Sequence, residues 1–173
     1  MDFAMTDEQE LLLESVREFC DRYFTEDVIK EMYETGDMPD EIAEAYRDAG
    51  FGLMGIPEEY GGIPCDKVTL GMMIEELYHS SGCNHILYQN SLTAFDIVEF
   101  GTPEQIQKYM DAYMETGWPL CSLSISEPGA GSDNRNMSCT AKKQDDGTYR
   151  LNGQKTWVTM GAKLPYTIVV AKD

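Results

Sequence analysis

Basic residues are scarce in this sequence of 173 residues. Only 13 lysines and arginines stand against 31 aspartates and glutamates, which gives a formal net charge of −18 at pH 7. Nucleic acids and anionic lipid surfaces attract proteins through a positive footprint, which this charge balance does not provide. We therefore expect no nucleic acid and no anionic membrane surface among the partners.

Long apolar runs are missing as well. No stretch approaches the roughly 20 apolar residues that a membrane-spanning helix requires, and the opening MDFAMTDEQELLLE is acidic where an export signal is basic. The cysteines number five, an odd count, and none of them forms a C-x-x-C pair. These features predict reduced thiols and a cytoplasmic location. We expect Cys20, Cys83 and Cys121 to be small buried apolar residues.

The charge is divided unevenly along the chain. Residues 1–118 contain 26 acidic and 6 basic residues, whereas residues 119–173 contain 5 acidic and 7 basic ones. The apolar periodicity changes from helical to strand-like at the same place. We therefore predict an N-terminal helical domain at 1–118 and the first part of a β-domain at 119–173.

The helical domain has clear start signals. Thr6 with Gln9 forms a predicted capping box, and Thr102 with Pro103 and Gln105 marks another helix start. Further helices are expected after Pro39, around residues 70–78 and over about 85–100. The side chains that we expect to face the core are Leu12, Val16, Phe19, Tyr23, Ile42, Ala45, Tyr46, Ala49, Leu70, Met73, Ile74, Leu77, Tyr78, Ile106, Tyr109, Met110, Tyr113 and Met114.

The last third of the chain predicts strands. The runs LCSLSIS, SCTAKKQ, TYRLNGQKTWVT and YTIVVAKD are rich in alternating or β-branched residues, and Asp145-Asp146-Gly147 indicates a hairpin turn. No partner strand and no covering helix follows the final run. Because natural sheets rarely leave such edges uncovered, we expect an incomplete sheet and a longer parent protein. The predicted fold class is α+β, a helical domain followed by the beginning of a β-barrel or sheet domain.

Two segments carry candidate chemistry. The first, Ser124–Asp133, is a strand that runs into a glycine-rich turn, where backbone amides can approach an anionic ligand and the serine hydroxyls can donate to it. The second, Asn152–Thr159, combines a tryptophan with β-branched residues. Taken separately, the first is equally well explained as a surface turn, and the second is better explained as ordinary strand packing.

Together these segments resemble motifs of the acyl-CoA dehydrogenase family. The chain has GIPEEYGG at 55–62, SEPGAGSD at 126–133 and NGQKTWVT at 152–159, in the order and near the spacing of that family. Ser124 and Asn136 depart from the residues usual at those positions, so we expect local adjustment there. The resemblance covers essentially the whole chain.

The resemblance implies a flavoprotein that binds FAD, with a C-terminal helical domain absent from this chain. It implies that Ser126 contacts the pyrimidine end of the flavin, that Ser132 lies near the pyrophosphate or the thioester, and that Thr159 lies near the flavin N5 atom. The full set of implied cofactor-binding residues is Leu123, Ser124, Ile125, Ser126, Gly131, Ser132, Trp157, Val158 and Thr159.

The implied reaction is α,β-dehydrogenation of an acyl-CoA thioester, in which a carboxylate removes the α-proton. In the family that base lies downstream, so we expect no catalytic residue in this chain and no activity from the chain alone. Glu127 and Asp133 belong to the turn motif and are poor candidates for the base.

The resemblance further places Tyr88, Gln89 and Leu92, together with Ser132, near the substrate. Bulky or polar groups there favour a short or polar acyl group, although Tyr88 and Gln89 are equally well explained as half-buried helix residues. The Leu87-Tyr88-Gln89 run and the opening Met1-Asp2-Phe3 also resemble the crotonobetainyl-CoA reductase branch, which works as an enoyl-CoA reductase.

Several alternatives remain open. His79, Cys83 and His85 crowd together but offer no fourth ligand, so a hydrogen-bonded structural histidine is expected rather than a metal site. The expected partners are an electron-transferring flavoprotein, which the acidic helical surface would dock, and further copies in a homo-oligomer, commonly a homotetramer. Rival readings are a non-catalytic helical assembly module and a flavin oxidase of the same fold.

Overall fold

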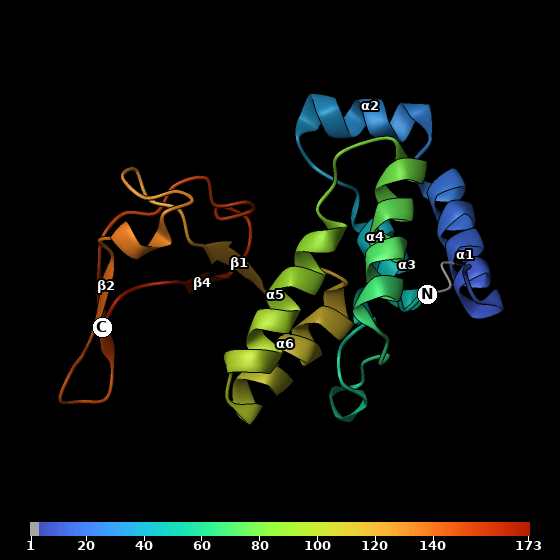
Figure 1. Ribbon diagram of the computed structural model, residues 1–173. Helices are drawn as coiled ribbons and strands as arrows, with labels where there is room; N and C mark the ends of the chain where they lie inside the picture. The colour runs from blue at the N-terminus through green and yellow to red at the C-terminus, as the bar shows by residue number, and fades with distance from the viewer. Residues whose placement is uncertain (1–3) are drawn as a thin grey trace. The chain divides into compact units, whose positions relative to one another are not determined.

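The computed structural model describes residues 4–173, apart from the side chains of residues 89–91. The chain divides into two compact units, Met1–Trp118 and Pro119–Asp173, and Figure 1 follows the elements within each. None of the described helices is long and apolar enough to cross a membrane.

The first unit is helical throughout its described part (Figure 1). Two short 3-10 helices, η1 (Phe51–Leu53) and η2 (Glu58–Tyr60), interrupt the α-helices. The α-helices are α1 (Asp7–Tyr23), α2 (Glu26–Thr35), α3 (Asp40–Asp48), α4 (Lys67–Ser81), α5 (Leu87–Phe100) and α6 (Pro103–Thr116).

The predicted helix starts are confirmed at both capping boxes. The side chain of Thr6 accepts a hydrogen bond from the amide of Gln9, and that of Thr102 accepts one from the amide of Gln105. In return, the side-chain oxygen of each glutamine accepts a hydrogen bond from the backbone amide of the threonine. Helix α6 ends at Gly117, which takes the left-handed conformation. Both helices therefore begin where their amide groups find side-chain acceptors.

The core of this unit lies where α1 packs on α4 and where α3 and α5 pack on α6. Phe19 contacts the rings of Tyr23, Phe24, Tyr46 and Phe51. Aromatic contact of this kind adds to the burial of apolar area that stabilises the unit. The fully buried large side chains here include Val16, Tyr46, Ile56, Met73, Leu77, Thr93, Tyr109 and Tyr113.

Some helix predictions were wrong. Helix α2 was not predicted, although Thr25 caps its start and Gly36 ends it in the left-handed conformation. Ala49 and Met114 are exposed, because both lie at the ends of their helices, beyond the packed turns. Ala43 is buried instead of Ala49.

The second unit holds the strands β1 (Cys121–Ser124), β2 (Thr140–Lys143), β3 (Tyr149–Asn152) and β4 (Tyr166–Val169). Strands β2 and β3 form the predicted antiparallel hairpin. Strand β4 pairs in parallel with β1, so the last strand does have a partner, contrary to the expectation from the sequence order. The chain after β4 continues to β2, where the amide of Ala141 donates to the carbonyl of Lys172.

The predicted strand TYRLNGQKTWVT is half wrong. It is a strand only as far as Asn152, and the chain then leaves the ladder. Trp157 and Met160 have φ values of 58° and 59°, in the left-handed region that strands do not use. The β-branched residues of this segment therefore form a loop.

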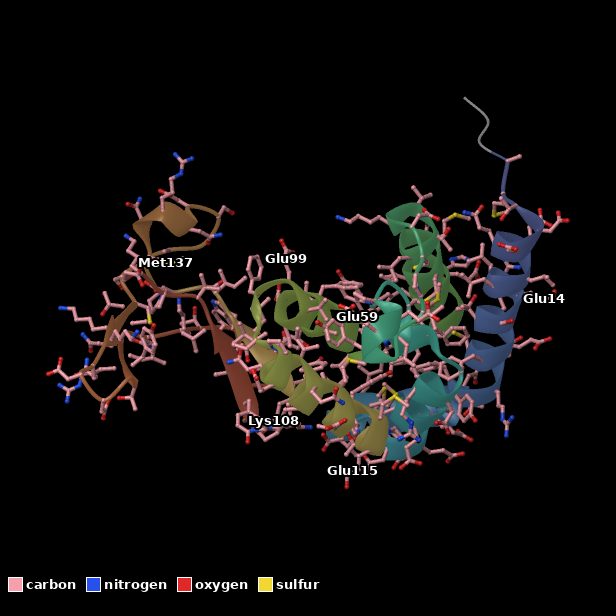
Figure 2. The ribbon with its side chains drawn as sticks, turned by 90° about the horizontal axis from the view of Figure 1, so that it is seen from below. Glu14, Glu59, Glu99, Lys108, Glu115 and Met137 are labelled. Atoms are coloured by element: carbon pink, nitrogen blue, oxygen red, sulfur yellow. The ribbon has the colours of Figure 1, made fainter. Side chains whose placement is uncertain are left out.

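The surface of the helical unit is acidic. Glu14, Glu59, Glu99 and Glu115 project outward from its ribbon in Figure 2, with Lys108 among them on α6.

Of the free cysteines, Cys20, Cys83 and Cys121 are buried as predicted, and so is Cys139. These four thiols therefore belong to the packed interior, whereas Cys65 is half-buried.

Candidate functional site

The two sequence motifs of the second unit meet side by side. The amide of Thr156 donates to the carbonyl of Ser126 at 2.9 Å. The ammonium of Lys155 donates to the carbonyl of Ile125 at 2.8 Å and to Oε1 of Glu127 at 2.9 Å. The glycine-rich turn and the tryptophan loop are therefore joined within one unit, which their spacing in the sequence alone could not establish.

Glu127 is the centre of this junction. Its side chain is 2% exposed, and its carboxylate accepts hydrogen bonds from the amide and hydroxyl of Ser138, the amide of Cys139 and the ammonium of Lys155. Its own backbone pairs with Ala130 in a tight turn, at 2.9 and 3.2 Å. One carboxylate thus ties the turn, the start of β2 and the loop after β3 together.

This environment fixes the charge of Glu127. The amide of Ser138 and the ammonium of Lys155 hold the pKa of the carboxyl down, to about 2. A carboxylate that accepts so many hydrogen bonds and resists protonation is a poor proton acceptor at neutral pH. Glu127 therefore serves the architecture of the turn, in line with the expectation that it is not the base.

The tryptophan loop presents an aromatic ring to the outside. Trp157 is 92% exposed and takes a left-handed backbone conformation that is unfavourable for a side chain of this size. The explanation of this segment as strand packing is therefore wrong, since the ring packs in no strand. The indole is therefore accessible on the surface of the second unit.

The other candidate cofactor residues fall into two groups. Ser124 is buried in β1, with its hydroxyl 2.7 Å from that of Thr167, so this hydroxyl is already engaged. Ser126 and Val158 are half-buried, whereas Ser132 and Thr159 are exposed. The remaining candidates are the half-buried Leu123 and Ile125 and the exposed Gly131.

Several polar groups here are available to a bound molecule. Among the described residues, no hydrogen bond involves the hydroxyls of Ser126, Ser132 and Thr159 or the amides of Gly131 and Ser132. The hydroxyl of Thr156 is buried without a partner, which is costly in the absence of a ligand or water. Donors of this kind beside an exposed indole fit a flat, polar-edged cofactor such as a flavin.

The candidate substrate residues lie in the first unit, on α5. Tyr88 and Leu92 are both half-buried. The side chain of Gln89 lies outside the described residues, as does the opening Met1-Asp2-Phe3.

The histidine cluster forms no metal site. Within the described part of the chain, no group of three His, Cys, Asp or Glu side chains could hold an ion. His85 is instead stacked between Tyr78 and Phe24, with ring centroids 4.5 and 4.9 Å apart. Contrary to expectation, its ring nitrogens make no hydrogen bond of good geometry, and burial, which the backbone of Leu77 offsets only in part, lowers the pKa of His85 to about 4.

Comparison with known sequences identifies the family. The sequence model of the acyl-CoA dehydrogenase N-terminal domain matches residues 6–116, and that of the middle domain matches residues 122–173. The chain belongs to the acyl-CoA dehydrogenase family. FAD-dependent dehydrogenation is the function of that family, and the resemblance inferred from the three motifs is confirmed.

Relatives of known sequence agree. The chain is 39% identical, over its whole length, to the "Probable acyl-CoA dehydrogenase YdiO" of Escherichia coli (strain K12), of which it covers 45%. The chain thus spans about half the length of the curated acyl-CoA dehydrogenase relatives that it matches.

Solved structures agree as well. A chain in a structure of the electron transferring flavoprotein of Acidaminococcus fermentans is 29% identical with a TM-score of 0.80, and "PigA with FAD and proline" is 26% identical with a TM-score of 0.79. Each comparison covers 99% of this chain and 45% of the other. The predicted α+β fold class is confirmed by these acyl-CoA dehydrogenase-like neighbours.

Sequence reasoning missed two contributors to the junction, Lys155 and Thr156. Both lie in the NGQKTWVT motif, but the motif alone assigns neither of them a role. A useful signal was available: Lys155 is the one charged residue of NGQKTWVT, and a lysine that is buried requires a carboxylate partner.

Proposed function

We propose that the whole protein containing this chain is an FAD-dependent acyl-CoA dehydrogenase, which removes the α- and β-hydrogens of an acyl-CoA thioester. One observation carries the proposal: the amide of Thr156 bonds the carbonyl of Ser126, which joins the two motifs of the family beside an exposed indole. Family membership supports the same conclusion.

The proposed FAD site uses residues of the second unit. Leu123, Ser124 and Ile125 contribute backbone and apolar contacts, because the hydroxyl of Ser124 is engaged by Thr167. Gly131 and Ser132 offer backbone amides suited to the negative charge of a pyrophosphate. Val158 supports the loop through its carbonyl, which accepts from the amide of Gly161 at 3.0 Å.

The catalytic contribution of these residues is electrostatic and steric. Bound FAD supplies the acceptor for the β-hydrogen. Ser126 and Thr159 would donate hydrogen bonds that stabilise negative charge on a bound flavin, and the exposed indole of Trp157 would offer an apolar surface that excludes water. The neighbour described as PigA with FAD and proline supports the choice of this cofactor.

The α-proton requires a base outside this junction. Glu127 is excluded by its low pKa and its saturated carboxylate. We therefore assign the base to the part of the whole protein that corresponds to the rest of its longer relatives, outside the span of this chain. Residues 4–173 then contribute binding, orientation and stabilisation of charge, and we propose no turnover by this chain alone.

For the substrate, we propose a short or polar acyl group, positioned by Tyr88, Gln89, Leu92 and Ser132. An enoyl-CoA reductase of the crotonobetainyl-CoA type is the alternative direction of the same chemistry. Carnitine metabolism, the cytoplasmic location and the homo-oligomer, commonly a tetramer, belong to this proposal too.

The proposed electron partner is an electron-transferring flavoprotein, docked on the helical unit. A groove of about 750 Å³ there is lined by apolar side chains that include Leu12, Phe19 and Ile63. Its acidic lining residues, which are Glu18, Glu41, Glu44 and Asp48, outnumber the single basic one, Arg22. Such a groove suits a partner segment with one apolar side chain flanked by lysine or arginine.

One set of assays tests the function and its rivals. The whole protein is purified, supplied with FAD and tested in three assays. The first contains acyl-CoA with an electron-transferring flavoprotein as electron acceptor, the second contains enoyl-CoA with a chemically reduced electron donor, and the third contains acyl-CoA with oxygen as the only acceptor. Turnover in the first assay supports the dehydrogenase, in the second the reductase, and in the third the oxidase. Failure to bind FAD would leave only the assembly module and overturn the proposal.

The docking groove has its own test. Glu44→Lys reverses one charge on the rim of the groove, and Glu99→Lys reverses an exposed charge on α5 outside the residues that line it. We expect the first variant to raise the apparent KM for the flavoprotein, most strongly at low ionic strength, where exposed charges are least screened. Equal KM values for both variants would contradict docking at this groove.

A further inference from the structure

The Glu127–Lys155 ion pair stands out because both charges are withdrawn from water. The side chains are 2% and 9% exposed, and Nζ of Lys155 lies 2.9 Å from Oε1 of Glu127. Arg17–Glu76, Lys30–Glu34 and Arg47–Asp48, the other ion pairs among the described residues, each keep at least one partner more than half exposed. A buried pair of this kind needs a reason, since apolar residues of similar volume stabilise a fold equally well.

The lysine of this pair also binds the backbone of the glycine-rich motif. The ammonium of Lys155 also donates a hydrogen bond to the carbonyl of Ile125, and the amide of the next residue, Thr156, donates one to the carbonyl of Ser126. These contacts fix the loop after β3 to consecutive residues of the turn motif. The relative position of the two segments is thus set by one ammonium group and one amide.

The segment that follows this anchor is the strained one. Trp157 comes directly after Thr156 with a φ of 58°, and Met160 has a φ of 59°. Non-glycine residues keep such conformations only where the surrounding structure holds them. Trp157 itself is 92% exposed, so its own side chain contributes little packing to that restraint. The restraint must therefore come from the anchor before it and from the turn after it.

We propose that Glu127 and Lys155 are positioning residues that set the placement of Trp157–Thr159 relative to Ser126, and thereby tune the reactivity of the flavin. This inference rests on the proposed function. Neither side chain touches the reacting atoms: Lys155 acts through Thr156 and Trp157, and Glu127 acts through Lys155. The carboxylate in turn is held by the amides of Ser138 and Cys139.

The alternative is a purely structural ion pair, and it makes different predictions. Loss of a structural pair lowers the thermal stability but leaves the bound flavin of each folded molecule unchanged. Loss of a positioning pair also changes the flavin itself, because the indole and the hydroxyl of Thr159 move relative to Ser126. The flavin absorption spectrum and its reduction rate at saturating FAD report this change.

The test uses the whole protein and the variant Lys155→Met, which keeps the length of the side chain and removes its charge. Lys143→Met, on the exposed face of β2, is the matched control, and Lys155→Arg is the conservative variant. At saturating FAD and acyl-CoA, we expect Lys155→Met to shift the flavin spectrum and to slow flavin reduction about tenfold or more. Lys155→Arg should recover most of the rate, and Lys143→Met should match the wild type.

A second variant covers the case in which Lys155→Met does not fold. Glu127→Gln has nearly the same shape, but it removes the negative charge and replaces one of the two acceptor oxygens with an NH2 group, so the donors of Ser138 or those of Cys139 and Lys155 lose their acceptor. It should show the same spectral shift and slowing. If the folded variants have the spectrum and reduction rate of the wild type, with only their melting temperatures lowered, the pair is structural and the proposal is overturned.

The outcomes also separate this inference from the proposed function. The function fails if the wild-type protein binds no FAD or if no acyl-CoA reduces it. The inference fails while the function stands if the wild type is reduced normally and the folded Lys155→Met and Glu127→Gln variants are reduced at the same rate.

Discussion

Gly153 packs directly against Cys139. A Cβ added at Gly153 would lie 2.7 Å from Cα and 2.9 Å from Sγ of Cys139, and the glycine has a φ of 152°. Cys139 is the buried residue whose amide donates to Glu127. The residue directly after β3 therefore packs on the residue directly before β2, whose amide holds the carboxylate of Glu127.

The first prediction follows from this close approach. Gly153→Ala should destabilise the second unit by about 2 kcal/mol, because the methyl group overlaps backbone atoms that cannot move aside cheaply. The thermal unfolding of the whole protein, followed by circular dichroism, measures the effect. Gly129→Ala is the control, since a Cβ there would meet no atom within 4 Å, and equal stability of the two variants would contradict the packing described.

The second prediction concerns Trp157. Because its ring is 92% exposed, Trp157→Ala should change the free energy of unfolding of the FAD-free protein by less than about 0.5 kcal/mol. The same change should weaken FAD binding about tenfold, through loss of the aromatic contact. FAD titration of the FAD-free protein checks the affinity. A large loss of stability with unchanged FAD affinity would show that the ring packs within the protein.

The third prediction concerns Thr159, which is exposed and bonded to no described group. Thr159→Ala should leave the fold intact and slow flavin reduction by acyl-CoA about tenfold, because one donor to the developing negative charge is lost. Thr159→Ser keeps the hydroxyl and should retain most of the rate. Rapid-mixing absorbance at saturating substrate gives the rates; identical values for all three proteins would mean that Thr159 does not serve the flavin.

The fourth prediction is an acid sensitivity of the helical unit. His85 is neutral when folded, with a pKa lowered from 6.5 to about 4 by burial, so the unfolded chain binds its proton more tightly. Stability from this group is complete above pH 6.5 and falls as the pH drops toward 4, by about 3 kcal/mol in all.

Denaturant unfolding of the helical unit at several pH values measures this dependence. His85→Phe keeps a ring between Tyr78 and Phe24 and should flatten the curve between pH 6.5 and 4. The second unit should instead lose stability at lower pH, as Glu127 titrates toward its pKa of about 2. An unchanged slope in His85→Phe would show that another group is responsible.

Much of the fold follows from local sequence signals. Two helix starts can be predicted from the capping boxes Thr6 with Gln9 and Thr102 with Gln105, because capping depends on residues three positions apart. The hairpin turn at residues 145–147 is equally local. Helix α2 was missed although its local signals were present: Thr25 caps its start, Gly36 ends it, and Val28, Ile29 and Met32 recur at helical spacing over only ten residues.

The candidate site was less accessible to sequence reasoning. Trp157 lies in a β-branched run, and only the backbone coordinates reveal its left-handed conformation. The pairing of β4 with β1 joins residues more than forty positions apart, for example Cys121 with Tyr166. Glu127 was placed in the right motif, but its partner Lys155 depends on the same long-range fold, which propensity and spacing do not encode.

The most direct test of the central claim is an anaerobic titration of the whole, FAD-loaded protein with a panel of acyl-CoA thioesters of different length and polarity. We predict that at least one thioester, among the short or polar ones, bleaches the visible flavin absorbance. Persistence of the absorbance with every thioester, beside its loss with a substrate of another class, would contradict the assignment of acyl-CoA dehydrogenase activity.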